Sequence, residues 1–368
     1  MLTGHSAPVL DFEFNPFHDN LISSAGEDNI IKVWSIPEGG LKTNVTQSLI
    51  DLHGHSKKVT LLRAHPTAEN ILASVSGDFS VKIWDIGSAS EVNTLSEHTD
   101  LIQDIVWDYR GNQYATSCKD KHIRLVDARI GQICNTIETA HDGAKSVKLT
   151  YLGNHDKLVS TGFTRQSQRQ FKIWDPRNLS VEVAKVDIDQ AAGVIMPFYD
   201  QDTNILYLAG KGDGNVRYYE LTSEGSGELH VFPLSDFRSS VSAKGMAWVP
   251  KRGVNIMACE TARLLKLTTN SVEPLSFFVP RKSESFQEDL YPETASIVPA
   301  HSASEWINGS DKAPNLMSLD PSSQLKVVQK KTFEAPKSAI VLQKELDEAN
   351  KRIKDLEGRL AAAGLSTA

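Results

Sequence analysis

GHSAPVLDFEFNPFHDNLISSAGEDNIIKVWS at residues 4–35 and GHSKKVTLLRAHPTAENILASVSGDFSVKIWD at residues 54–85 share one pattern. In each stretch a histidine is followed 23 residues later by an aspartate, and six residues after the aspartate comes a tryptophan. Equal spacing over so long a segment indicates an internal repeat. A repeat decides the architecture, because each unit contributes one supersecondary element to a larger array.

Further copies of the pattern follow at intervals of roughly 40 to 50 residues. A third unit contains His98, Thr116, Asp120 and Val126-Asp127. A fourth contains His141 and Trp174-Asp175, with Gln168 at the expected position of the aspartate. Two weaker units end in GKGDGNVRYYE and in ACETARLLKL. Six units are therefore expected.

Within the units, short apolar runs alternate with turn-forming stretches. VLDFEF, VKIWDI, LYLAG and VRYYEL are separated by AGED, SGDF and GKGDG. Such runs, bounded by Gly, Asp and Ser, are typical of short strands joined by tight turns. The sequence therefore predicts an all-β chain over residues 1–275.

The repeat resembles that of the WD-repeat family, in which each unit is one four-stranded blade of a β-propeller. In that family His, Ser or Thr, Asp and Trp form a hydrogen-bonded chain that holds a loop against a tight turn. An unpaired buried member costs about 1–3 kcal/mol. The resemblance assigns these roles to His5, Ser24, Asp28, Trp34, His55, Ser74, Asp78, Trp84, His98, Thr116, Asp120, His141 and Trp174.

Composition and motifs argue against several other classes of protein. Lys and Arg total 39 against 46 Asp and Glu, so the net charge of −7 gives no general attraction to nucleic acid. The sequence contains no run of 18 apolar residues, so we do not expect membrane insertion. Its three scattered cysteines fit a reducing compartment. We also expect neither a metal nor a cofactor nor an enzyme: His53-Gly54-His55 has no completing ligands, and GKGDGN lacks the phosphate-loop pattern.

Residues 276–320 form an extension that follows the repeats. It is punctuated by proline but contains large apolar residues, so we expect it to pack on the propeller rather than to be disordered. Its FQEDLYPETAS and SEWINGSD, together with VSTGFTRQSQRQFKIWDPRNL and the opening stretch, resemble the coronins, a family of actin-binding WD-repeat proteins. The resemblance covers nearly all of the chain except the linker at residues 321–337.

Residues 338–364 show a heptad pattern that predicts a coiled coil, because apolar residues recur at alternating spacings of three and four. Its seam contains Leu342, Leu346, Ala349, Ile353, Leu356 and Leu360. Arg352, Ile353, Leu356 and Glu357 resemble a motif that favours three-stranded coiled coils and is found in coronins. We therefore expect a homotrimer, with a dimer and a helix docked on its own propeller as the alternatives.

The resemblance implies a function. Coronins bind F-actin and regulate the actin-related nucleating complex and cofilin-driven turnover, which would place the protein in the cytoplasm at the cortical actin cytoskeleton. The competing interpretation is a WD-repeat scaffold without affinity for actin, since propellers host many functions.

The number of blades departs from the family pattern. Coronins begin with a further blade, whereas this sequence starts almost directly at the Gly-His of what would be the second. Seven blades need roughly 280–315 residues, and about 275 precede the extension. Three possibilities stay open: a ring closed with six blades, an open ring with exposed edges, and a truncated form.

Overall fold

The structure is a computed structural model that describes residues 1–223, 228–282, 285–323, 333, 346, 348–354 and 356. It divides into two compact units, Met1–Thr332 and Phe333–Ala368. The first unit contains every strand and the helix α1 (Ala303–Ile307). Each unit is described by itself.

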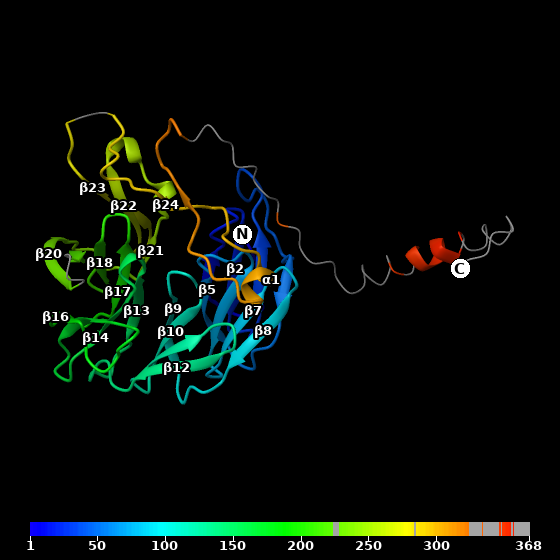
Figure 1. Cartoon of the computed structure of the whole chain (residues 1–368), viewed down its shortest axis with the longest axis horizontal. Coiled ribbons are helices and arrows are strands. Elements are labelled where there is room, and N and C mark those ends of the chain that lie inside the picture. The colour runs from blue at the N-terminus through cyan, green and yellow to red at the C-terminus, as the bar shows by residue number, and fades with distance from the viewer. Residues whose placement is uncertain are drawn as a thin grey trace. The chain divides into compact units, whose positions relative to one another are not determined.

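Six antiparallel sheets, each built from consecutive strands, make a six-blade WD-repeat propeller (Figure 1). The first two blades are β1 (Val9–Phe14), β2 (Leu21–Gly26), β3 (Ile31–Ser35) and β4 (Ile50–Leu52), then β5 (Val59–Ala64), β6 (Ile71–Ser76), β7 (Val81–Asp85) and β8 (Ser90–Leu95). The third and fourth are β9 (Ile102–Trp107), β10 (Gln113–Cys118), β11 (Ile123–Asp127) and β12 (Gln132–Ile137), then β13 (Lys148–Leu152), β14 (Lys157–Phe163), β15 (Arg169–Trp174) and β16 (Ala184–Asp189). The fifth is β17 (Ile195–Asp200), β18 (Ile205–Gly210), β19 (Val216–Ser223) and β20 (Leu229–Phe237).

The sixth blade has three strands: β21 (Gly245–Trp248), β22 (Glu260–Leu267) and β23 (Val272–Phe278). Three short 3-10 turns lie in connections, at Gly153–His155, Lys251–Gly253 and Ile256–Ala258. β23 continues past residue 275, the expected end of the propeller, because Phe277 packs on Tyr207 with ring centroids 4.9 Å apart.

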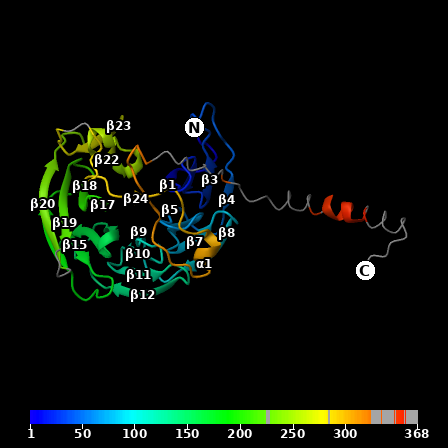
Figure 2. The same ribbon diagram turned by 45° about the horizontal axis from the view of Figure 1, so that its top comes forward.

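Figure 2 shows the blades following one another around the ring, and apolar clusters hold successive blades together. Alternation along each strand directs one set of side chains to the preceding blade and the other set to the following blade. One cluster joins the second and third blades, and includes Ile83 and Trp107, both buried. Others join the third blade to the fourth, the fourth to the fifth and the fifth to the sixth.

The first blade has an uncovered face. On β1, Leu10, Phe12 and Phe14 are 40%, 58% and 53% exposed, whereas Val59 and Leu62 on the equivalent strand β5 are fully buried. The sixth and first blades are linked at loop level, where the Arg252 guanidinium pairs with Asp19 at 3.0 Å. The exposure of β1 corresponds to the open-ring arrangement among the three possibilities.

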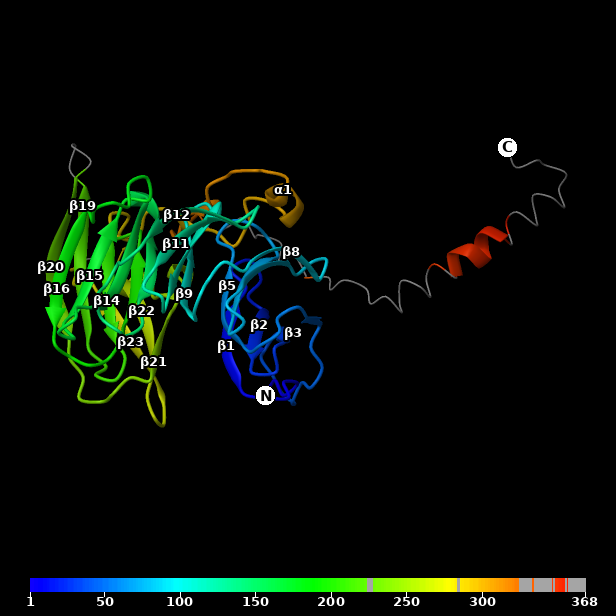
Figure 3. The same ribbon diagram turned by 90° about the horizontal axis from the view of Figure 1, so that it is seen from below.

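The extension crosses the propeller after β23. Tyr291 donates a hydrogen bond to the carbonyl of Glu260 in the sixth blade, and β24 (Thr294–Ala295) pairs with β25 (Leu316–Met317). Between these two strands α1 begins at Ser302, whose side chain and Glu305 form a capping box. Figure 3 shows α1 on the side of the propeller opposite to the N-terminus.

In the second unit, the described residues Leu346, 348–354 and Leu356 are helical. Leu346, Ile353 and Leu356 are 54%, 52% and 48% exposed, and Ala349 and Arg352 are exposed as well. Three of the predicted seam and motif residues, Leu342, Glu357 and Leu360, lie outside the described part of the chain.

Candidate functional site

The first blade brings its four predicted residues together. His5 Nδ1 lies 2.8 Å from Asp28 Oδ2, His5 Nε2 lies 2.7 Å from Ser24 Oγ, and Trp34 Nε1 donates to the same Oγ at 2.8 Å. Because a carboxylate only accepts, the ring proton is on Nδ1, and the Ser24 hydroxyl donates to Nε2. Burial opposes ionisation of Asp28, but the hydrogen bond from His5 holds the pKa of Asp28 below its usual value.

The second blade repeats this geometry. His55 lies 3.2 Å from Asp78 Oδ2 and 2.7 Å from Ser74 Oγ, and Trp84 Nε1 donates to Ser74 at 2.8 Å. Asp78 also accepts from the Ser56 N–H at 2.9 Å and from the Ser80 hydroxyl at 2.6 Å. Although burial works in the other direction, these hydrogen bonds keep the pKa of Asp78 well below its usual value.

The third blade brings together only part of its predicted set. His98 Nε2 lies 2.9 Å from Thr116 Oγ1, but Asp120 pairs with Arg124 at 2.7 Å and accepts from Thr99 instead of from the histidine. His98 Nδ1 has no hydrogen-bond partner among the described residues. Burial lowers the pKa of His98 to about 4, so the ring is neutral near pH 7.

In the fourth blade a glutamine takes the place of the aspartate, at a position that the sequence did not predict. His141 Nε2 lies 2.8 Å from Ser160 Oγ, which also accepts from Trp174 Nε1 at 2.9 Å. Gln170 Nε2 donates to His141 Nδ1 at 3.0 Å, which leaves the ring proton on Nε2. At the predicted turn position, the backbone N–H of Gln168 donates to Thr164 Oγ1 at 3.2 Å instead. Because Ser160 follows His141 by 19 residues, as Ser24 follows His5, spacing alone was enough to locate it.

The fifth unit uses its aspartate between blades. Asp213 pairs at 2.9 Å with Arg169 of the fourth blade, and Arg169 also makes a two-pronged contact with Asp189 at 2.6 Å. The Arg169 side chain is 1% exposed, so the carboxylates replace the water that its charge loses on burial.

All these networks lie on one side of the propeller, which we call the loop face. It consists of the tight turns between second and third strands and of the loops that enter each blade. Neighbouring segments are bonded to one another: Asn29 to Ser56 at 3.4 Å, Lys121 to Asp142 at 2.9 Å and Gly212 to Ala243 at 2.8 Å. The histidine networks therefore give this face a fixed shape that suits it for contact with another macromolecule.

The opposite side of the propeller holds the extension. Trp306 is fully buried in α1, its Nε1 donates to the Gly111 carbonyl at 3.1 Å, and its ring meets His65 edge-on at 4.8 Å. Arg129 donates to the carbonyl of Trp306 at 2.8 Å and lies 5.3 Å from its ring. Burial lowers the pKa of His65 to about 3. These contacts of Trp306, which we call the Trp306 anchor, join α1 of the extension to the second and third blades.

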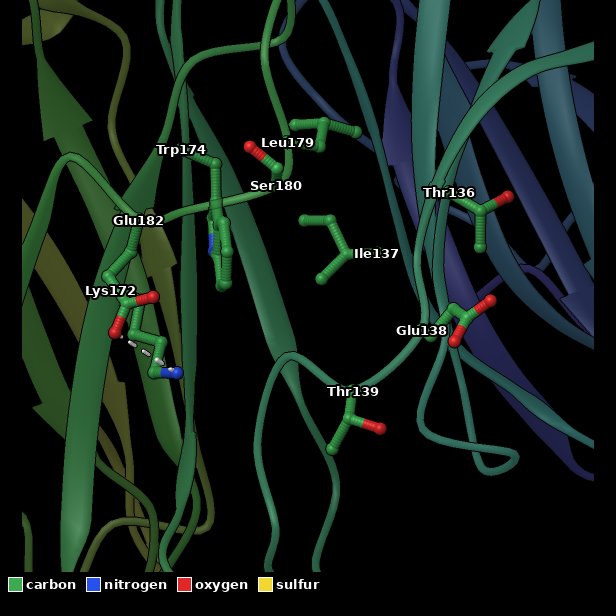
Figure 4. Close-up of a pocket in the computed structure, with 9 residues that line it drawn as sticks. All are labelled: Thr136, Ile137, Glu138, Thr139, Lys172, Trp174, Leu179, Ser180 and Glu182. Atoms are coloured by element: carbon green, nitrogen blue, oxygen red, sulfur yellow. Dashed lines mark ion pairs between the residues drawn. The ribbon is translucent and has the colours of Figure 1, made fainter.

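A cleft of about 360 Å³ opens between the third and fourth blades, and its lining is mostly polar (Figure 4). Lys172 pairs there with Glu182 at 3.5 Å and lies 5.3 Å from the ring of Trp174. Two of the three charged residues of the lining are thus paired within the protein, and the third, Glu138, is exposed. Trp174 belongs to the network of the fourth blade, which gives this part of the cleft a structural role.

The described residues offer no metal site and no membrane-spanning helix. Across the described residues, no three His, Cys, Asp or Glu side chains are grouped so that they would hold a metal ion. Over the same residues, no helix has both the length and the apolar composition needed to cross a membrane. The two faces of the propeller are therefore the candidate interaction surfaces.

Comparison with known proteins is consistent with this architecture. A family model described as "WD domain, G-beta repeat" matches residues 1–35, 46–85 and 89–127. A second, described as a type of WD40 repeat, matches residues 272–314, which span β23, α1 and most of the extension. The WD40 domain of a Toxoplasma gondii coronin has a similar crystal structure, with a TM-score of 0.82, 32% identity, and coverage of 86% of this chain and 82% of that one.

Curated relatives match over almost the whole length. Coronin-A of Dictyostelium discoideum is 45% identical over 368 residues, which cover 98% of this chain and 81% of that protein. Coronin-2B of Xenopus laevis is 46% identical over 342 residues, covering 92% of this chain and 71% of the relative. Identity at this level over blades and extension together is more than a shared propeller fold provides, and the chain belongs to the coronin family of WD-repeat proteins.

Proposed function

We propose that this protein binds actin filaments and thereby organises them and regulates their turnover or branching. The observation that carries the proposal is the relationship to coronins, which extends through the blades and the extension at about 45% identity. Coronins are known for association with actin. The two loop-rich faces, one fixed by buried networks and the other by the extension, supply rigid surfaces for such a partner.

Oligomerisation through residues 338–364 is the second part of the proposal. The exposed Leu346, Ile353 and Leu356 lie on a helix whose heptad pattern needs a partner helix to cover its seam. A trimer would place three propellers on one filament, where the second binding event becomes intramolecular and raises avidity.

The trimer is tested by sedimentation equilibrium. We expect the mass of three chains for the wild type and of one chain for Ile353→Asp, because a buried carboxylate at one seam position destabilises so short a coiled coil. Lys351→Asp, which lies off the seam, is the matched control and should remain trimeric. A single-chain mass for the wild type would reject oligomerisation, and a two-chain mass would indicate the dimer.

Finer consequences follow from filament binding. We propose that the actin-related nucleating complex and cofilin are partners on filaments and that the protein acts in the cytoplasm at the cortical actin cytoskeleton. The alternative is a WD-repeat scaffold that serves other proteins and has no affinity for actin. Co-localisation with filaments in cells, and its loss after filament depolymerisation, separates these two functions.

The direct test is co-sedimentation with F-actin, using the whole chain and a chain that ends at residue 337. We expect saturable pelleting of the whole chain, with weaker pelleting of the shorter one. If neither pellets above the level seen without actin, the scaffold interpretation is the better one.

A further inference from the structure

The loop face carries an uneven distribution of charge. Over the third to sixth blades its turns and entry loops present exposed cations that follow one another around the ring. We call this set the basic arc, and it consists of Lys119, Lys121, Lys145, Arg165, Lys211 and Lys244. The first blade, by contrast, has Glu27 and Asp28 in the corresponding turn.

Contacts between loops hold the basic arc in place. Lys121 Nζ donates to the carbonyl of Asp142 at 2.9 Å, and Lys145 Nζ donates to the carbonyl of Ala192 at 2.7 Å. Lys145 also lies 4.6 Å from the centre of the Phe163 ring. Because these acceptors are uncharged carbonyls, the lysines keep their net positive charge while losing freedom of movement.

Most carboxylates near the basic arc are already neutralised. Asp120 pairs with Arg124, and Asp189 and Asp213 share the two cations Arg169 and Arg217. In the described turns and entry loops of these blades, three exposed carboxylates, Glu97, Glu138 and Asp142, face six exposed cations. A basic region on a chain with a net charge of −7 directs the approach of acidic partners toward one side of the molecule.

We propose that the basic arc is the surface that meets the acidic face of the actin filament. This inference rests on the proposed function and specifies which face serves it. A broad, rigid array of separate cations complements a rigid acidic protein surface. A bilayer is a weaker fit, since peripheral membrane binding combines cations with several apolar side chains. In the described loops 96–101, 119–122, 138–147, 164–168, 211–215 and 238–244, the large exposed apolar residues are Leu101 and Val241, and they lie in different loops.

The test reverses charge at three positions of the basic arc in the full chain: Lys119→Glu, Arg165→Glu and Lys211→Glu. None of these side chains forms an ion pair with another described residue, so the fold should tolerate the change. The control carries the same change in net charge away from the loop face: Lys185→Glu on β16, Arg177→Glu after β15 and Lys282→Glu after β23. Thermal unfolding of both variants verifies that they are folded.

Co-sedimentation with F-actin is measured at low and at high salt. We expect the basic-arc variant to bind at least about tenfold more weakly at low salt and the control to stay within about twofold of the wild type. The difference should shrink at high salt, because the Debye length falls from about 10 Å at 0.1 M to about 3 Å at 1 M.

The outcomes separate this inference from the proposed function. If the wild type pellets with actin and the basic-arc variant pellets equally well, the inference is wrong and the function stands. If the wild type does not pellet, the function itself fails, and the inference fails with it. Vesicles containing phosphatidylserine and phosphatidylinositol bisphosphate form a second arm: binding there that the basic-arc variant loses, with actin binding unchanged, would assign the surface to membranes.

Discussion

At the scale of single residues, the same His–Ser–Trp hydrogen-bond network occurs in three blades with the histidine ring proton on either of its two nitrogens. In the first two blades an aspartate fixes the histidine proton on Nδ1, and in the fourth blade Gln170 leaves it on Nε2. In each case the serine accepts a hydrogen bond from the tryptophan. The histidine in the entry loop therefore stays connected to the blade whether its other partner is aspartate or glutamine. The network thus accepts either aspartate or glutamine as the partner of the histidine Nδ1, and the third blade lacks this partner, because His98 Nδ1 is unpaired among the described residues.

Asp78 should be among the polar residues most important for stability. Asp78→Ala leaves His55 Nδ1, the Ser56 N–H and the Ser80 hydroxyl without their common acceptor. We expect a loss of about 1–3 kcal/mol in the free energy of unfolding, measured with a chemical denaturant. Asp142→Ala, an exposed carboxylate on the same face, should change it by less than about 0.5 kcal/mol. Equal stability of Asp78→Ala and wild type would remove the structural role of this network.

Buried histidines should make the fold sensitive to acid. Burial lowers the pKa of His141 to about 3 from 6.5, so the unfolded chain binds a proton that the folded chain excludes between these values. Stability is therefore fully present above pH 6.5 and is lost as pH falls toward 3, at about 1.4 kcal/mol per pH unit for this residue. His141→Gln should flatten the dependence of the unfolding free energy on pH in that window. An unchanged slope would show that His141 is protonated in the folded protein.

At the scale of elements, the extension is a structural part of the propeller. It links the sixth blade through Tyr291 to the second and third blades through Trp306. The matched WD40-type region at residues 272–314 includes both the last strand and this anchor. Because the extension connects the sixth blade to the second and third blades, it limits the opening of the ring. The first and sixth blades themselves meet through loops.

Trp306→Ala should detach the anchor. The substitution removes a fully buried indole and leaves the Gly111 carbonyl with His65 as its remaining donor, so we expect a loss of about 3–5 kcal/mol. Hydrogen exchange should show faster exchange in residues 296–317 and in the connections that contain His65 and Gly111. Ile307→Ala, in the same helix but 39% exposed, is the control and should leave exchange nearly unchanged.

The sequence predicted the blades and two of the hydrogen-bond networks, and there is a physical reason why it did not predict the others. The number of blades followed from the spacing of the repeats, and the networks around His5 and His55 followed from the resemblance to WD repeats, because a repeated unit repeats its contacts. The pairing of Asp120 with Arg124, the role of Gln170 and the use of Asp213 between blades did not follow. Each of these pairings depends on which side chains lie near the turn in the folded structure. The spacing of residues along one unit does not contain that information.

At the scale of the whole molecule, we expect the uncovered face of β1 to promote association between propellers. Phe12 and Phe14 are more than half exposed on β1, whereas Leu62, at the position of Phe12 in β5, is fully buried. We expect Phe12→Ser with Phe14→Ser to alter monomer stability little and to reduce light scattering on concentration, because exposed apolar patches promote association. Val59→Ser on the equivalent, covered strand is the contrasting variant and should destabilise the fold. Unchanged scattering of the double variant would show that this face does not associate.

We propose that this coronin-family chain oligomerises and binds actin filaments by avidity. The most direct measurement compares the full-length wild type with Ile353→Asp in F-actin co-sedimentation, over a range of actin concentrations. We expect both chains to pellet and the wild type to bind about 10–100-fold more tightly, since multivalent engagement multiplies a weak single-site affinity. Equal affinities would contradict the role of avidity, and absence of pelleting by both chains would contradict actin binding altogether.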